Sequence, residues 1–128
     1  MLVFWLFMLL VDLLIPFLMI GFGRSFSKKA PDKINSLFGY RTQRSMKNRE
    51  TWDYAHHYIG KLWFISGLIL LPLSVIPLIC VFGTNAELIG TVGGIVIAPQ
   101  FVPFIGAIIP TERALKKNFD PYGRRRNK

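Results

Sequence analysis

The sequence predicts an all-α membrane protein with three transmembrane helices. Three apolar runs, at 2–23, 62–82 and 88–109, each reach the roughly 20 residues that a helix needs to cross the hydrocarbon core of a bilayer. A closed barrel is the other backbone arrangement that can cross, but the alternation of apolar and polar residues typical of its strands is absent. A loop at 24–61 and a tail at 110–128 make up the rest, so we expect a single domain over residues 1–128.

The basic residues predict the orientation of these spans. The chain carries 16 Lys and Arg and has a formal net charge of +9; nine of the 16 lie in the loop and the other seven follow Pro110. Basic segments beside spans stay in the cytoplasm, so we expect the N-terminus outside and the loop and tail inside. Because this charge flanks apolar spans, we expect it to meet anionic lipid headgroups rather than nucleic acid.

The first apolar run leaves two alternatives to a stable span. A cleaved signal peptide is one, but no basic residue precedes this run, it contains Asp12, and no convincing small-x-small cleavage site accompanies it. A re-entrant segment broken at Pro16 is the other. We expect the first span to be retained, with an irregular or only briefly helical stretch after it at 25–37.

A helix is expected to begin near Ser45 to Asn48, whose side chains can cap it, with Glu50 in its first turn. No helix breaker follows before Gly60, so the sequence predicts a cytoplasmic juxtamembrane helix, 48–61, that runs into the second span. Four aromatic residues along it form the belt typical of a membrane interface: Trp52, Tyr54, Tyr58 and Trp63.

The third span is predicted to start with Thr84 or Asn85 as its cap, and Thr111 to cap a short tail helix, 112–118. Small residues line one face of this span, where a neighbouring helix can approach closely. They are Gly90, Gly94, Ala98 and Gly106. Packing against another helix of the same chain is one interpretation, and a homo-oligomer interface is the other.

Among the polar side chains inside the expected spans, Asp12 and Gln100 are the candidates for a functional site. A carboxylate at the depth of Asp12 is costly and should face the other helices, either paired or protonated. Ser74, Thr91 and Gln100 lie within a few turns of its depth on the other spans. One hypothesis is a proton or ligand site at Asp12 and Gln100; the other is a protonated carboxyl that is hydrogen-bonded to one of these groups and fixes the packing.

A second polar group surrounds the start of the second helix. Asn48, Trp52, His56 and Gly60 are four residues apart and so share one face. Before them, the turn at 39–42 is expected to fold back onto that face, with the forked guanidinium of Arg41 bonded to something buried. This group is either a structural clasp or a binding site for a partner.

His56 and His57 diverge by about 100° on a helix, so we expect no metal site. Catalytic motifs are missing, so we expect neither an enzyme nor a cofactor.

The stretch 39–63 resembles the signature of the SdpI family of small bacterial membrane proteins. The matching residues are Gly39, Arg41, Thr42, Ser45, Asn48, Trp52, His56, Gly60 and Lys61. The resemblance implies a multipass protein of the bacterial plasma membrane without catalytic activity. The family is named for an immunity protein that protects toxin-producing cells from their own secreted peptide and that also holds a transcriptional repressor at the membrane.

The best functional hypothesis is therefore a non-enzymatic membrane protein of the immunity or signalling type. Its partner would be a membrane-active peptide toxin bound by the helices, or a cytoplasmic regulator protein bound by the basic loop. A small oligomeric transporter or ion-conducting protein and an accessory subunit of a larger membrane complex remain as alternatives.

Overall fold

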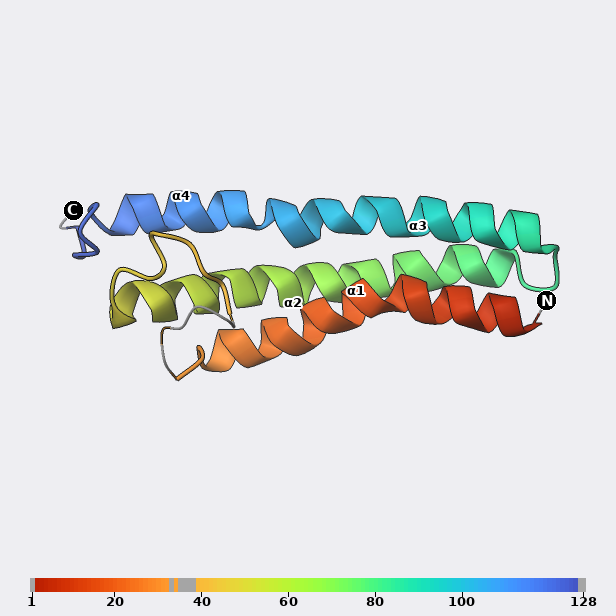
Figure 1. Cartoon of the computed structure of the whole chain (residues 1–128), viewed down its shortest axis with the longest axis horizontal. Helices are drawn as coiled ribbons and strands as arrows, with labels where there is room; N and C mark the ends of the chain where they lie inside the picture. The colour runs from red at the N-terminus through yellow and green to blue at the C-terminus, as the bar shows by residue number, and fades with distance from the viewer. Residues whose placement is uncertain (1, 33, 35–38, 127–128) are drawn as a thin grey trace.

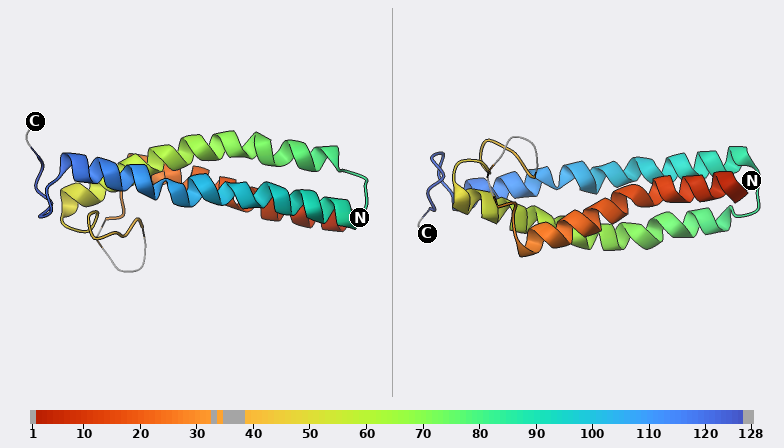
Figure 2. Two further views of the ribbon diagram at one scale, coloured as in Figure 1. Left: turned by 90° about the horizontal axis from the view of Figure 1, so that it is seen from above. Right: turned by 60° about the horizontal axis from the view of Figure 1, so that its bottom comes forward.

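The computed structural model describes residues 2–32, 34 and 39–126, and within them it is all-helical. The helices are α1 (Leu2–Lys28), α2 (Arg49–Cys80), α3 (Ala86–Gly106) and α4 (Ile108–Asn118). The first three run antiparallel to their neighbours, and α4 continues the line of α3 (Figures 1 and 2). Three stretches are long and apolar enough to cross a membrane, namely α1, α2 and the run Ala86–Asn118. The prediction of three membrane-spanning helices is confirmed.

The bundle has two chemically different ends (Figure 1). The turn end holds the N-terminus and the α2–α3 turn, and here Trp5 donates its indole N–H to the carbonyl of Leu78 at 2.7 Å. The loop end holds the α1–α2 loop and the chain after Asn118. A buried apolar cluster lies there, around Ile59 of α2 and Leu115 of α4. The basic residues that the structure describes therefore lie towards this end, in the last turns of α1, the loop, the first part of α2 and the chain after Pro110.

Helix α1 packs on α2 through glycines that bring the two backbones into contact. A Cβ added at Gly60 would lie 2.5 Å from the amide nitrogen of Ser27 and 2.7 Å from the carbonyl oxygen of Gly23. A Cβ at Gly23 would lie 2.5 Å from the amide nitrogen of Phe64. Since those atoms belong to backbone, only glycine fits at both positions. Small residues at a contact between membrane helices allow the two backbones to approach closely, as they do here.

Most of the predicted small-residue face of α3 does not pack inside the chain. A Cβ added at Gly90 would lie 3.6 Å from the Phe4 ring, but a Cβ at Gly94 or Gly106 would meet nothing within 4 Å, and Ala98 is exposed. The glycine turned towards α1 is Gly93, whose added Cβ would overlap the Met8 methyl carbon. Adjacent helical positions differ by about 100°, so the interpretation of within-chain packing is wrong for most of this face.

The helix ends confirm some predicted caps and correct others. Asn48 caps α2 in a capping box with Thr51, and Asn85 caps α3. Helix α1 continues beyond the expected span to Lys28, so the chain after Gly23 is helical for longer than predicted. Thr111 is not a cap, because α4 follows α3 after Ala107 alone; its hydroxyl instead donates to the Ala107 carbonyl at 2.7 Å.

Candidate functional site at the loop end

His56 is the centre of the polar group at the loop end, and both of its ring nitrogens are engaged. The amide N–H of Tyr40 donates to Nε2 at 2.8 Å, and Nδ1 lies 2.8 Å from the carbonyl oxygen of Trp52. Because Nε2 accepts, Nδ1 must carry the hydrogen, so this imidazole is neutral. Gly39, which precedes Tyr40, has φ +104°, and a Cβ there would lie 2.7 Å from Nε2. Glycine is therefore required at this turn.

Trp52 joins the loop to the face of α2. Its side chain is completely buried, its ring centroid lies 4.3 Å from that of His56, and its indole N–H donates to the carbonyl of Pro31 at 2.9 Å. The ring of Phe26 on α1 meets the His56 ring edge to face at 4.9 Å. The end of α1, the loop and α2 thus meet around one imidazole.

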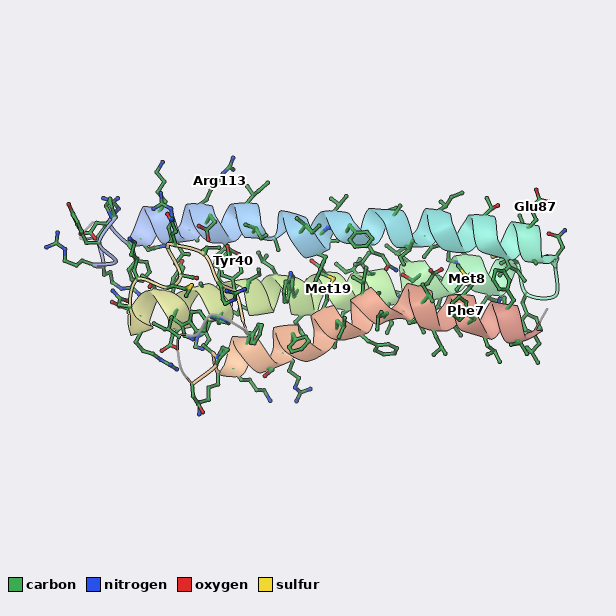
Figure 3. The ribbon with its side chains drawn as sticks, in the orientation of Figure 1. Phe7, Met8, Met19, Tyr40, Glu87 and Arg113 are labelled. Atoms are coloured by element: carbon green, nitrogen blue, oxygen red, sulfur yellow. The ribbon has the colours of Figure 1, made fainter. Side chains whose placement is uncertain are left out.

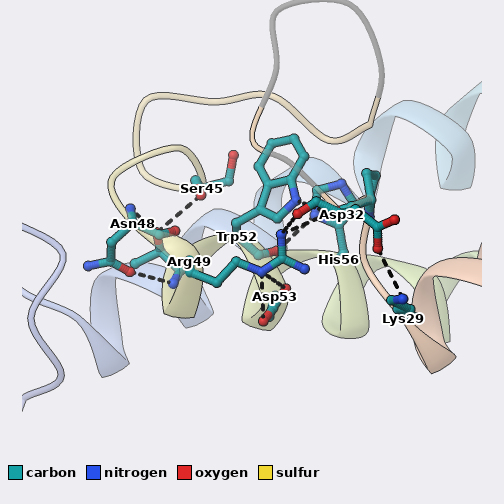
Figure 4. A network of polar contacts seen from close by, with 10 residues as sticks. Lys29, Asp32, Ser45, Asn48, Arg49, Trp52, Asp53 and His56 are labelled. Carbon is teal, nitrogen blue, oxygen red and sulfur yellow. Dashed lines mark hydrogen bonds and ion pairs between the residues drawn. The ribbon is translucent and has the colours of Figure 1, made fainter.

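Arg49 adds a second connection between α2 and the chain after α1, which the sequence did not indicate. Its guanidinium donates to the carbonyls of Pro31 and Asp32 and pairs with Asp53 at 3.1 Å (Figure 4). These groups are exposed, so the ion pair itself contributes little. The backbone contacts nevertheless fix where the loop leaves α1.

The turn after Tyr40 is closed by Ser45, which is buried. The Thr42 amide donates to the Ser45 hydroxyl at 2.9 Å, and that hydroxyl donates to the Tyr40 carbonyl at 2.9 Å. The Thr51 hydroxyl lies 3.1 Å from the Ser45 carbonyl. Asn48 reaches the tail as well, because its side-chain amide donates to the Gly123 carbonyl at 2.7 Å. The predicted fold-back of the turn onto α2 is confirmed.

Glu112 of α4 completes the clasp, by which we mean the bonded set Tyr40, Thr42, Ser45, His56 and Glu112. Its Oε2 accepts from the Tyr40 hydroxyl at 2.5 Å and from the Thr42 hydroxyl at 2.9 Å. Figure 3 shows Tyr40 between α2 and α4. Burial and the Glu112 carboxylate raise the pKa of the Tyr40 phenol well above its ordinary value, so the hydroxyl keeps the proton that it donates.

We expect a double-mutant cycle to find strong coupling between Tyr40 and Glu112. Tyr40→Phe and Glu112→Ala should each lower the free energy of unfolding, and the double variant should lose less than their sum by about 1–2 kcal/mol, because both remove the same hydrogen bond. Thermal unfolding in mild detergent measures all four proteins. Tyr40→Phe combined with Glu87→Ala, at the other end of the bundle, is the additive control. Additivity in both pairs would contradict the contact.

Arg41 lies differently from the prediction. Its side chain is exposed and makes no hydrogen bond or ion pair with any residue that the structure describes. The expectation that it bonds to a buried group is wrong, because the backbone of its neighbours and His56, rather than a guanidinium, fix the turn. Lys61 and His57 are also exposed. The remaining signature residues are structural in their contacts, while Arg41 faces outward.

The intramembrane polar group has an unexpected arrangement. Asp12 is fully buried, but Gln100 donates to its backbone carbonyl at 2.7 Å and to the Ser74 hydroxyl at 2.7 Å. The two carboxylate oxygens of Asp12 and the Gln100 Oε1 have no hydrogen-bond partner among the described residues. Thr91 is exposed and takes no part. The predicted hydrogen bond from one of these side chains to the carboxyl of Asp12 is therefore absent from this part of the chain.

Sequence reasoning missed the role of Glu112 and of the Pro31 carbonyl. Glu112 lies 72 positions from Tyr40, and a single acidic residue at the start of a tail carries no pattern that points to a loop.

Within residues 2–32, 34 and 39–126, no group of three His, Cys, Asp or Glu side chains is placed to hold a metal ion.

Comparison with known proteins identifies a family whose model covers most of the loop and the helices α2 and α3 described above. The model of the "SdpI/YfhL protein family" matches residues 32–111. A relative from Bacillus subtilis (strain 168), named "Uncharacterized protein YfhL", is 45% identical over 40 residues, which are 31% of this chain and 36% of the relative. No solved structure matches. The family match takes in most of the loop, α2, α3 and the first turn of α4, more than half of the chain, and this multipass membrane protein therefore belongs to the SdpI/YfhL family.

Proposed function

We propose that this protein is a non-enzymatic protein of the bacterial plasma membrane, of the immunity or signalling type, which binds a membrane-active peptide or a cytoplasmic regulator through its loop end. The outward position of Arg41 is the observation that carries this proposal. Tyr40 and Thr42, on either side of it, are bonded to His56, Ser45 and Glu112. The loop thereby holds in a fixed place a guanidinium that has no bonded partner among the described residues, and its fork suits an acidic group of a partner.

The titratable groups of the clasp support a role in binding rather than catalysis. Both nitrogens of His56 are occupied by backbone groups, and the Oε2 of Glu112 accepts two hydrogen bonds. The Tyr40 phenol has a raised pKa and resists losing its proton. A general base needs a free lone pair and a pKa near the working pH, and these groups are used instead to hold the loop.

The charge distribution supports an orientation with the loop end in the cytoplasm. The Lys and Arg residues that the structure describes belong to the end of α1, the loop, the first part of α2 or the chain after Pro110, and these segments lie together at the loop end. The turn end carries Glu87 and no basic residue. Basic segments stay on the cytoplasmic side, so a cytoplasmic regulator would reach Arg41 directly, and a peptide inserted from outside would reach it across the bilayer.

We expect Arg41→Ala to remove the protective or signalling activity without changing the fold. The side chain is exposed and unbonded within the described residues, so its loss should change the free energy of unfolding by less than about 0.5 kcal/mol. The assay deletes the gene in the native host, restores wild type or a variant, and measures survival in culture supernatant from sibling cells. Wild type should restore survival, and Arg41→Ala should not.

Lys47→Ala is the matched control, because Lys47 is an exposed cation of the same loop and also unpaired among the residues described. It should protect as well as wild type. Survival of the deletion strain without any added gene would contradict the immunity role. Equal rescue by Arg41→Ala and wild type would contradict the assignment to Arg41.

A further inference from the structure

A groove of about 350 Å³ lies between α2 and α4 at the loop end, on a side of the bundle that the clasp does not use. Tyr54 and Tyr58 of α2 form one wall, and Arg113, Lys117 and Asn118 of α4 form the other. Pro110 lies at the end of the groove nearer α3. Arg113 extends outward from α4 (Figure 3). The groove is therefore accessible from the outside of the bundle at the loop end.

The charged groups of this groove are hydrogen-bond donors. Neither Arg113 nor Lys117 forms an ion pair with a described residue, and no acidic side chain lines the groove. Glu112, the neighbour of Arg113, is turned to Tyr40 and Thr42 instead. The Tyr54 hydroxyl accepts from Asn118 at 2.9 Å and so keeps its own hydrogen for a ligand. A forked guanidinium, an ammonium and a phenol fit the oxygens of a phosphate.

The surfaces that continue from the groove are apolar. Ile65 follows Tyr58 by two helical turns on the same face of α2 and is 56% exposed. Ile109 precedes Arg113 by one turn of α4 and is 61% exposed. A ligand whose anionic head lies in the groove would thus find hydrocarbon-compatible surface on the side of the expected spans. Paired tyrosines at this level are typical of the headgroup region.

We propose that this groove is a binding site for one anionic phospholipid. Its phosphate contacts Arg113, Lys117 and the Tyr54 hydroxyl, and its acyl chains lie along the exposed apolar residues beyond Pro110. A soluble anion would use the cations but not the apolar surfaces. The site is separate from Arg41 and does not depend on the proposed role in immunity or signalling.

The test measures lipid binding to the full-length protein in mild detergent by native mass spectrometry. Phosphatidylglycerol and phosphatidylcholine are titrated separately. We expect wild type to retain one phosphatidylglycerol in preference to phosphatidylcholine, and the variant Arg113→Gln/Lys117→Gln to bind it about tenfold more weakly, because two charge-assisted contacts are lost. Lys117→Gln alone should show an intermediate loss. Both residues are exposed, so thermal unfolding should be unchanged.

The variant Lys47→Gln/Lys116→Gln is the matched control. It removes the same charge from exposed positions of the loop and α4 that do not line the groove. It should retain the lipid within about twofold of wild type. Equal losses in the two double variants would overturn the site in favour of general attraction. Displacement of the lipid by inorganic phosphate or by polyglutamate at similar concentration would overturn the lipid assignment in favour of a soluble anion or an acidic protein.

Discussion

Gly60→Ala should separate α1 from α2 at the loop end. The new Cβ would lie 2.5 Å from the Ser27 nitrogen, 2.7 Å from the Gly23 oxygen and 2.9 Å from the Phe26 carbonyl carbon. All three are backbone atoms of α1, so no rotamer change relieves the contact and the helix itself must move. We expect a loss of about 3 kcal/mol or more, at the upper end of overpacking effects.

Thermal unfolding in mild detergent measures this loss, and Gly94→Ala is its matched control. Both changes add one methyl group to the interior of a long apolar helix. At Gly94 the methyl meets nothing within 4 Å, so stability should stay the same or rise by a few tenths of a kcal/mol from the helix preference of alanine. Equal unfolding temperatures for the two variants would contradict the close packing of α1 and α2.

Trp52→Ala should release the loop from α2. The indole is completely buried, contacts the His56 ring and donates to the Pro31 carbonyl. Removing a buried tryptophan typically costs about 3–5 kcal/mol. Trp52→Phe keeps a ring against His56 but removes the hydrogen bond, so it should recover all but about 1–2 kcal/mol of that loss.

Hydrogen exchange resolves where the effect of Trp52→Ala falls. The Tyr40 amide, bonded to His56 in the wild type, should lose its protection in Trp52→Ala and keep most of it in Trp52→Phe. Tyr122→Ala is the control, since Tyr122 is an aromatic residue of the same end that is 76% exposed; its loss should leave this amide protected. A Tyr40 amide that stays equally protected in Trp52→Ala would mean that the indole does not hold the loop.

The features that the sequence predicted correctly are those carried by local pattern. Apolar length identified the three spans, and cap chemistry placed the start of α2 near Ser45 to Asn48 and that of α3 at Thr84 or Asn85, where Asn48 and Asn85 are the caps. The spacing of Trp52 and His56 placed both on one face, and the structure brings the turn after Gly39 onto that face. Helical periodicity and turn chemistry depend on residues a few positions apart, so a short stretch of sequence is enough to recognise them.

The features that the sequence did not predict depend on rotation and on distant contacts. Gly93 and Gly94 are neighbours, and only the packed bundle decides which one turns towards α1. Arg41 was expected to bond inward because arginine suits buried acceptors, but the turn is closed by backbone donors and leaves the guanidinium outside. Glu112 comes from a helix far along the chain, so its bonds to Tyr40 and Thr42 could not be anticipated from spacing.

The contact between Glu112 and the loop also sets an order of events during synthesis. Tyr40 and Thr42 leave the ribosome 72 and 70 residues before the carboxylate that they bond. Until the last helix is in place, those two hydroxyls have no acceptor on α4, and the loop is held by α2 alone. A chain whose third span fails to insert therefore lacks these two hydrogen bonds of the loop. The loop has all of its hydrogen bonds only when α4 is in place, so its final shape depends on insertion of the third span.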